Sequence, residues 1–600
     1  MTDMDTLIGR LGTRFGVLAE SNTHQLTVIA SNGDIAVGDL FLLPSRRGRE
    51  RFYIFRATQY ANVMNRTIDV DDVARSKLTM PDSYLADDLQ DEQLIELKGM
   101  VLGYAEQHID DGSWTFHRPR RLPEHLTDVY LVDGSSAEVA DVMRILLGSQ
   151  LGEGLYVGDL LAGEQPLRGV AVCMPPFALS HHIGVFGRTG SGKSNLMMVL
   201  LRSIMNHNRA VARSDCEGPS LSILAIDPHD EFRNWHAATG GAGGIRAIVS
   251  GYTDAELQQL VEPFYYLTAK DIAHPGIERR AFISRADLVP DDLISVMDFS
   301  EQQISFANQF YGHFGEHWVG RLLMGDTGGG DDDGNGPEFL DSTVAAVQRR
   351  VGFLRTGHTR VFTPFDADLG RPYDSLLPDI ICAMESGRVL VIDTTLMTEI
   401  EQFLFTTVVA RVLFSLRKAL RSAESTESLE REIRLALDND DDQNQIGMRH
   451  LADALMERLR DGKLPYLDGD VIRSSNLLPF VNVVVEEAPS VLNPQRLRFG
   501  SIFRDISRQG RKFGIGLTVV SQQVSEIDNG VLTQLNTELT MALGNESERR
   551  EAIRNASADL MGFERELQVM EKGQVLLSAS YKDVPLPVQV PDYDRFSSGD

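Results

Sequence analysis

The chain has 600 residues, of which 42% are hydrophobic and 24% are charged, so it is long enough for several domains with buried cores. Its 58 Lys and Arg against 86 Asp and Glu give a net charge of −28, which argues against a surface coated in positive charge for nucleic acid. Net charge says nothing about distribution, so a local basic channel stays open.

Membrane and secreted classes are excluded by the same inspection. No run of about 20 apolar residues occurs, and no apolar segment follows the acidic start of the chain, so we expect a cytoplasmic protein without a signal peptide or a membrane span. Three distant cysteines predict neither a disulfide framework nor a Cys-based zinc site.

Residues 1–165 are expected to form a small β-barrel. Short β-branched or aromatic runs at Ile8–Leu18, His24–Ile29 and Phe52–Arg56 are separated by turn residues. Two basic clusters lie here, and each is either a solvated loop or a contact for a partner or nucleic acid: Arg46, Arg47, Arg49 and Arg51, and Arg118, Arg120 and Arg121.

From about residue 170, apolar strands alternate with helices, which predicts an α/β core with a mainly parallel sheet. The expected strands are Ile183–Phe186, Ser222–Ile226, Arg388–Ile392, Val481–Val485, Gly516–Val520, Glu538–Leu543 and Gln574–Leu577. We predict a first core part over 166–231, a helical insertion over 232–387, and a second core part over 388–600 with an acidic insertion near 422–476.

Within the helical insertion, one helix is indicated by an apolar stripe at Leu340, Val344, Val347, Val351 and Leu354. The glycine- and aspartate-rich stretch Gly328–Gly336 is expected to be a disordered surface loop, and Asp438–Asp442 a solvated acidic run.

The segment Gly187–Ser194 reads Gly-Arg-Thr-Gly-Ser-Gly-Lys-Ser and matches the complete P-loop pattern between a strand and an apolar helix. Glycines let backbone amides point at phosphate oxygens, and the helix N-terminus adds partial positive charge. Lys193 is expected on the β- and γ-phosphates and the Ser194 hydroxyl on Mg²⁺. The residues expected to hold the nucleotide are Gly190, Ser191, Gly192, Lys193, Ser194 and Asn195.

Three expected strands end in acids. The first runs into Glu486 and Glu487, where one carboxylate can hold Mg²⁺ and the next can act as general base, unless both are simply solvated. The second ends at Asp227, which can orient water or metal, or cap a helix with Pro228 at its first position. The third ends at Asp393, for which a structural role is the default.

The segment Arg496–Lys512 contains six basic residues and one acid, a reversal of the overall charge. A helix would place Arg504, Arg508 and Arg511 on one face. They form a solvated face, a DNA-facing surface, or, for Arg508 or Arg511, an arginine finger supplied to a neighbour. Gln522, at the tip of the next strand, either senses the γ-phosphate or is an ordinary loop residue.

These motifs together resemble the HerA/FtsK family of ring ATPases. The resemblance lies in Gly187–Ser194, in Asp227-Pro228-His229 with Glu231, in Glu486-Glu487-Ala488, in Gly510–Gly514 and in Ser521-Gln522, and their order along the chain fits as well. It implies a RecA-like core, an N-terminal barrel of the HAS type, ATP bound between neighbours in a ring of six, and duplex DNA threaded through the pore.

The resemblance also implies roles for individual residues. Glu486 and Glu487 become the Walker B acids, with Glu486 on Mg²⁺ and Glu487 as the base, while Arg511, followed by Arg508, is the finger candidate. Three positions depart from the family pattern: Asp230 stands where Gly is usual, Pro489 where His or a similar polar residue is usual, and Gln523-Val524 where Arg-Pro is usual.

Three functions follow as alternatives. The first is an ATP-driven duplex-DNA translocase or helicase that works with a partner nuclease, since the sequence has no nuclease signature of its own. The second is an ATPase scaffold of an anti-phage defence complex, which docks a nuclease or a sirtuin-like NAD-hydrolase on its barrel. The third, a small-molecule kinase or GTPase, is disfavoured because no base-reading N-K-x-D motif is found and a kinase would not need the Glu486-Glu487 pair.

Overall fold

The computed structural model of the protein describes residues 3–22, 25–31, 33–63, 94–215, 217–234, 244, 264–272, 278–325, 340–365, 370–438, 448–462, 464–472, 478–499 and 501–598. These residues divide into two compact units. Unit 1 comprises residues 1–175, 186–199 and 536–592, and unit 2 comprises 176–185, 200–535 and 593–600. Each unit is described by itself.

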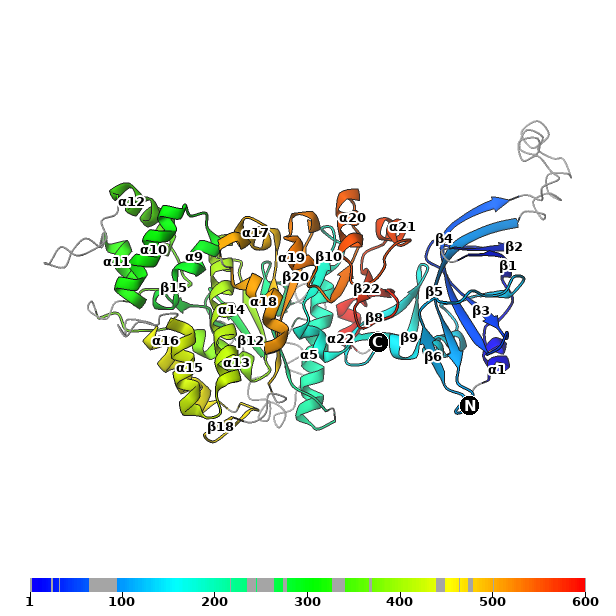
Figure 1. Ribbon diagram of the computed structural model, residues 1–600, viewed down its shortest axis with the longest axis horizontal. Helices are drawn as coiled ribbons and strands as arrows, with labels where there is room; N and C mark the ends of the chain where they lie inside the picture. Colours follow the sequence, from blue (N-terminus) through cyan, green and yellow to red (C-terminus); the bar gives the residue numbers. More distant parts are fainter. Residues whose placement is uncertain are drawn as a thin grey trace, which may run out of the picture. The chain divides into compact units, whose positions relative to one another are not determined.

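A closed barrel forms the N-terminal part of unit 1 (blue strands in Figure 1). Six strands close in the order β2-β1-β7-β3-β4-β5, with β5 pairing back to β2, and β6 adds to β5. Alternating buried positions such as Leu26, Val28, Phe41 and Tyr53 point into a continuous apolar core. The bounds are β1 Gly16–Ser21, β2 Leu26–Ala30, β3 Leu40–Ser45, β4 Arg51–Val63, β5 Leu94–Gln107, β6 Trp114–His117 and β7 Asp128–Leu131.

The rest of unit 1 is an antiparallel group of strands that the chain enters twice. Strands β21, β22, β23, β8 and β9 pair in that order, so residues beyond 536 complete a sheet begun near residue 155. Their bounds are β8 Leu155–Ala162, β9 Gln165–Met174, β21 Thr537–Thr540, β22 Gln574–Ala579 and β23 Leu586–Gln589. The helices are α1 Met4–Gly9, α4 Ala137–Leu147, α20 Glu546–Asn555 and α21 Glu564–Val569.

Unit 2 is built on a parallel sheet with the strand order β13-β12-β16-β11-β19-β20, followed by β10. Every residue of β11, β16 and β20 is buried, as expected of parallel strands covered on both faces. The bounds are β10 Ile183–Phe186, β11 Leu221–Asp227, β12 Phe264–Thr268, β13 Glu278–Arg280, β16 Val389–Asp393, β19 Phe480–Val485 and β20 Ile515–Ser521.

Helices accompany this sheet, and the longest, α14, contacts α9, α13, α15 and α18. A group of green helices in Figure 1, α9 to α12, carries two short parallel strands, β14 and β15. The bounds are α5 Lys193–Ala212, α6 Glu231–Asn234, α9 Pro290–Val296, α10 Glu301–Phe314, α11 Trp318–Met324, α12 Asp341–Arg350, α13 Leu377–Glu385, α14 Glu399–Ser422, α15 Thr426–Asp438, α16 Arg449–Asp461, α17 Pro489–Leu492, α18 Ile502–Gln509, α19 Asn529–Leu532 and α22 Tyr593–Ser598, with β14 Ile283–Ser284, β15 Phe362–Thr363, β17 Leu467–Asp468 and β18 Val471–Ile472.

The predicted fold class, with its barrel and its α/β core, is confirmed, with local differences. Ile8–Leu18 is not one strand, because Met4–Gly9 forms α1, capped by Asp3, and β1 begins only at Gly16. The last two expected strands, Glu538–Leu543 and Gln574–Leu577, correspond to β21 and β22, which pair with each other in antiparallel orientation. Residues 232–387 contribute β12 and β13 to the sheet as well as helices, and the four-part domain division stays a prediction.

The predicted apolar stripe lies on α12 and the 3₁₀ turn after it, where Val344, Val347, Val351 and Leu354 are buried but Leu340 is exposed. Gly328–Gly336 and residues 439–442 of the predicted acidic run lie outside the described residues. No helix in the described part of the chain is long and apolar enough to span a membrane.

A buried ion pair ties the barrel to the C-terminal part of unit 1. The guanidinium of Arg56 on β4 binds both carboxylate oxygens of Glu566 on α21, with an Nε–Oε2 distance of 2.8 Å, and lies over the ring of Phe563. Both side chains are almost fully buried. Because a buried charge without its partner is costly, each of the two residues depends on the other.

Glu566→Ala is therefore expected to lower the free energy of unfolding by about 3–5 kcal/mol, since it leaves Arg56 charged, buried and unpaired. Glu564→Ala on the exposed side of the same helix is the matched control and should change stability little. Urea denaturation followed by fluorescence measures both. If the paired variant Arg56→Leu with Glu566→Leu is no more stable than Glu566→Ala, the unpaired charge is not the cause of the loss.

Candidate active site

The P-loop lies in unit 1 and has the backbone that a phosphate cradle requires. After β10 the chain passes through Gly190 and Gly192, with φ of 76° and 107°, into α5. Residues with a side chain rarely adopt these angles, which accounts for glycine at both positions. A Cβ on Gly187 would come within 2.7 Å of the Ser191 hydroxyl and 2.9 Å of the Met541 Cβ, so this glycine is required for packing.

Backbone hydrogen bonds from residues next to β21 and β22 hold the P-loop in place. The Arg188 amide donates to the Ala542 carbonyl at 2.9 Å, and the Gly573 amide donates to the Ser191 carbonyl at 2.9 Å. Lys193 donates to the carbonyl of Gly187 at 2.8 Å, so its ammonium lies over the loop.

Asn195 donates its side-chain amide to the Pro591 carbonyl at 2.8 Å, which gives this predicted nucleotide contact a structural role as well. Its contact with nucleotide, like that of the other loop residues, stays a prediction.

The two predicted Walker B acids follow β19 in unit 2. Glu486 is half-buried and Glu487 is exposed at a turn that leads into α17. Glu487 has a φ of 48°, which is uncommon for a residue with a side chain. The turn is held by the Ala488 amide, which donates to the Val520 carbonyl of β20 at 3.2 Å. Strain of this kind concentrates at functional sites.

Asp227 ends β11 and is buried. Its two oxygens accept from the backbone amides of Glu231 and Phe232, both at 2.9 Å. The expected capping is thus present, but α6 begins at Glu231, so Pro228 is not at the first helical position. Burial raises the pKa of Asp227 to about 6, and the charges of Asp230 and Asp393 raise it against these hydrogen bonds.

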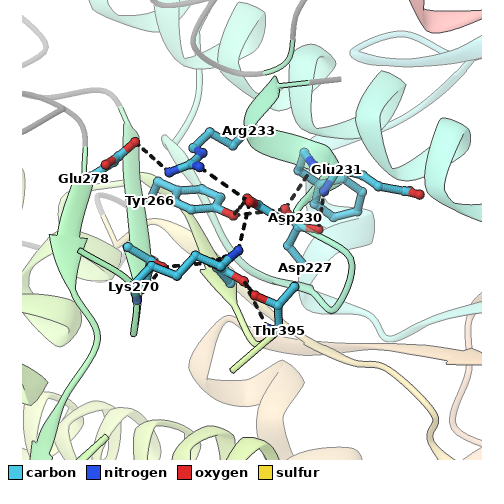
Figure 2. A network of polar contacts seen from close by, with 11 residues as sticks. Asp227, Asp230, Glu231, Arg233, Tyr266, Lys270, Glu278 and Thr395 are labelled. Atoms are coloured by element: carbon cyan, nitrogen blue, oxygen red, sulfur yellow. Dashed lines mark hydrogen bonds and ion pairs between the residues drawn. The ribbon is translucent and has the colours of Figure 1, made fainter. Parts of the chain in front are cut away.

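Around Asp227 a polar network joins the carboxyl ends of β11, β12 and β16 (Figure 2). Lys270 is its centre: its ammonium lies 2.9 Å from Asp230 Oδ2 and 3.0 Å from Asp393 Oδ2. Tyr266 donates its hydroxyl to Asp230 and, at 3.3 Å, to Asp227. Burial opposes ionisation of Asp393, but hydrogen bonds from Thr395, Lys270 and Thr268 outweigh it and hold its pKa below the ordinary value.

Arg233 closes the network on its other side. It donates to Glu278 of β13 at 2.9 Å, reaches Asp230 at 3.4 Å, and stacks over the Tyr266 ring (Figure 2). Asp230, with a φ of 56°, therefore has three partners: Arg233 of α6, Tyr266 of β12 and Lys270 just after β12. Sequence reasoning noticed Asp230 only as a departure, and it missed Tyr266 and Lys270 because residues 232–387 were expected to lie outside the sheet.

The three arginines that were predicted on one helix face lie on two separate elements. Arg504 and Arg508 lie on α18, which ends at Gln509, while Arg511 lies in the 3₁₀ turn Gly510–Phe513. Arg508 and Arg511 are both exposed. Buried Arg417 of α14 holds the end of the turn by donating to the Phe513 carbonyl at 3.2 Å, and it pairs with buried Glu385 at 2.6 Å.

Gln522 follows β20, so it lies at the carboxyl end of the strand, half-buried. Arg511 precedes the same strand. Seven strand residues, roughly 20 Å at about 3.3 Å each, separate the two positions. The Glu487 turn lies at the carboxyl end of the neighbouring parallel strand. Arg511 therefore lies at the amino ends of the strands of the unit 2 sheet, and Glu487 lies at their carboxyl ends.

Most of the barrel arginines form ion pairs with acids of unit 1. Arg49 and Arg51 both pair with Glu106, at 2.7 and 2.6 Å, Arg46 pairs with Asp5, and Arg118 pairs with Asp583 at 2.8 Å. Arg120 and Arg121 are exposed. The first cluster is thus mostly neutralised by acids of the same unit, which favours the structural interpretation for it.

The residues present fit a nucleotide with Mg²⁺. The loop offers glycines with free approach, an ammonium and the start of a 20-residue helix, and no heavy atom lies within 4 Å of where a Cβ on Gly190 would stand. Mg²⁺ is commonly held by one or two protein oxygens with phosphates and waters, and the Ser194 hydroxyl at the start of α5 is an oxygen of that kind. Among the described residues, no cluster of three or more His, Cys, Asp or Glu forms a metal site on its own.

Comparison with known proteins gives one family. Residues 155–319 match the family model described as "Helicase HerA, central domain". The chain is 22% identical over 477 residues to a DNA double-strand break repair helicase HerA of Pyrococcus furiosus, covering 76% of this chain and 72% of that protein. It is 25% identical over 150 residues to a probable helicase of Methanocaldococcus jannaschii, where it covers 24% of this chain and 28% of that protein.

Among solved structures, VirB4 of Thermoanaerobacter pseudethanolicus is similar at 14% identity and a TM-score of 0.37, over 74% of this chain and 98% of that one. The complete P-loop, the paired acids after β19, the matched central domain and the similarity over three quarters of the chain agree with one another. The chain is therefore similar to the HerA family, by the family model over residues 155–319 and by 22% identity over 477 residues.

Proposed function

We propose that this protein is a ring-forming ATPase that couples ATP hydrolysis to movement along, or unwinding of, duplex DNA. The observation that carries the proposal is the P-loop, in which Gly190 and Gly192 adopt left-handed backbone angles directly before α5. Similarity to the HerA family supports DNA as the polymer, since the P. furiosus relative is named a DNA double-strand break repair helicase.

In this proposal the chain's residues divide the work. Backbone amides of Gly190 to Lys193 and the Lys193 ammonium hold the phosphates, while Ser194 and Glu486 hold Mg²⁺, which would neutralise charge on the phosphates. Glu487 accepts a proton from the attacking water, and Gln522 orients that water or senses the γ-phosphate. Asp227, in its ionised form, orients water or metal from the end of β11 in the same sheet.

The proposal includes a ring of six with a finger in trans. Arg508 and Arg511 are exposed. Arg511 lies at the amino ends of the strands of unit 2, whereas Glu487 lies at their carboxyl ends. An arginine in that position is suited to a neighbour's nucleotide rather than to the acids of its own chain.

A partner enzyme, a nuclease or a sirtuin-like effector, would dock on the barrel. Exposed apolar residues at Ile109, Leu122 and Leu126 support that surface.

The direct test is ATP hydrolysis with and without duplex DNA. We expect turnover that rises when DNA is added, and a fall in kcat of about 10²–10⁴-fold in Glu487→Gln with ATP binding retained. Glu526→Gln, an exposed acid of the same unit, is the control. Absence of hydrolysis in both conditions contradicts the proposal, and normal turnover in Glu487→Gln contradicts the assignment of the base.

The finger in trans is tested by complementation. Lys193→Ala lacks a working P-loop and Arg511→Ala lacks the finger, so each should be inactive alone. Mixing them equally before assembly creates interfaces with an intact P-loop and an intact finger. About a quarter of wild-type activity should return if subunits mix at random. The control is the double variant Lys193→Ala with Arg511→Ala, which should not restore the activity of Arg511→Ala. Failure of both single variants to complement, with mixed rings verified, contradicts a finger in trans.

The strand-end network predicts a pH dependence. Asp227 has a pKa of about 6, raised by burial and then by neighbouring carboxylates, including Asp230. Asp230→Asn removes a like charge while keeping a residue that tolerates left-handed backbone angles. The pKa of Asp227 should fall, so the acid limb of the ATPase pH profile should move to lower pH. Asp271→Asn, an exposed acid next to Lys270, is the control. An unchanged limb in Asp230→Asn means that ionisation of Asp227 does not limit turnover.

A further inference from the structure

A basic surface lies in the helical part of unit 2, in a stretch of sequence outside the motifs of the candidate active site. From residue 349 to residue 360 the sequence has four arginines and one histidine and no acid, in a chain of net charge −28. Arg349 and Arg350 end α12, and Arg355 and Arg360 flank a tight turn. Arg371 follows in the next described segment. All five arginines are exposed.

The turn between Arg355 and Arg360 is a defined structure. Thr356 and Thr359 form an isolated bridge around Gly357, whose φ of 87° permits the tight reversal. The chain then enters β15, which pairs in parallel with β14. Arg285 directly follows β14, and its guanidinium reaches the turn, where it donates to the Thr356 hydroxyl at 3.3 Å.

Arg285 is the unusual member of this surface. It is 5% exposed, its Nε is buried without a hydrogen-bond partner, and no carboxylate among the described residues forms an ion pair with it. Burial, and then the positive charge of Arg371, lower the pKa of Arg285 to about 10, so the guanidinium remains charged at neutral pH. A buried cation beside a second cation is unfavourable unless an anion joins them.

Among the described residues, the exposed arginines have no acidic partner either. Within the described residues, Arg349, Arg355, Arg360 and Arg371 make no ion pair, and Arg350 contacts only the ring of Phe299, at 5.6 Å. The contrast with the barrel is clear, because there Arg49 and Arg51 share Glu106. The ordinary alternative for exposed arginines is a solvated face, but that alternative does not explain the buried, unpaired Arg285.

We propose that Arg285, Arg355 and Arg371, with Arg349 and Arg360 beside them in the chain, form a site for the phosphodiester backbone of duplex DNA. Guanidinium groups suit phosphate oxygens because they donate in a fork and stay charged. The basic residues occur along a helix end, a turn and a following segment, which suits a polymer with repeated charges better than one small anion. This inference rests on the proposed function, for which it names the surface that contacts DNA.

Contacts with phosphates can be counted from salt dependence. The logarithm of the association constant falls with the logarithm of salt concentration by about 0.9 for each phosphate neutralised on duplex DNA. Arg355→Gln with Arg371→Gln should therefore weaken duplex binding and reduce the slope by about 2, as measured by fluorescence anisotropy of a labelled duplex. These two residues are chosen because they are exposed, whereas replacing Arg285 risks the fold.

The matched control is Arg554→Gln, an exposed arginine near the end of α20 in unit 1, which should leave the slope unchanged. ATP hydrolysis without DNA should be unaltered in the double variant, since none of these residues belongs to the nucleotide site. Inorganic phosphate at constant ionic strength should not displace the duplex.

Two results would overturn the inference in distinguishable ways. If the wild-type protein hydrolyses ATP but binds no duplex, the DNA function and this surface both fail. If the wild type binds duplex and the double variant keeps its affinity and slope, only this surface fails. Loss of binding to polyglutamate in the double variant, with duplex binding intact, would assign the surface to an acidic protein instead.

Discussion

The arrangement of parallel strands in unit 2 forces carboxylates together. Strands β12, β16, β11 and β19 run in the same direction, so their last residues meet at one edge of the sheet, and β11 and β16 end in register with Asp227 beside Asp393. Several acids at one low-dielectric edge repel one another. Lys270 and Arg233 offset this repulsion by ion pairs, and the hydroxyl of Tyr266 adds hydrogen bonds. The geometry of the strand ends around Asp227 and Asp393 depends on that compensation.

Positive charge follows a different distribution from the one that the total of −28 suggests. In unit 1, several arginines are paired with acids, as at Glu106 and Glu566. In unit 2, Arg417 is matched with Glu385, whereas Arg508, Arg511 and the arginines after α12 make no ion pair in the described part of the chain. An acidic surface discourages non-specific adhesion to polyanions, so unmatched arginines stand out as selective contacts.

The sequence was sufficient for the features that have strong local signals. The P-loop, its strand and helix, and the acids after β19 all lie where the motif and the apolar runs predicted. The barrel was predicted as a class, but its first strand was misplaced, because Asp3 caps a helix that the β-branched run concealed. Lys270 and Tyr266 were not predicted, since only the pairing of β12 with β16, a long-range contact, brings them to Asp227 and Asp393. The position of Arg285 likewise depends on the pairing of β14 with β15.

The ion pair of Arg56 with Glu566 also bears on how the chain is made. Its two residues are 510 positions apart, and the strands that complete unit 1 after residue 536 follow residues 200–535 of unit 2 in the sequence. During synthesis, the buried arginine of the barrel therefore has no Glu566 to pair with until those residues of unit 2 have been translated. The Ala542 and Gly573 contacts of the P-loop likewise form only after that point, so unit 1 is completed after most of unit 2 has been made.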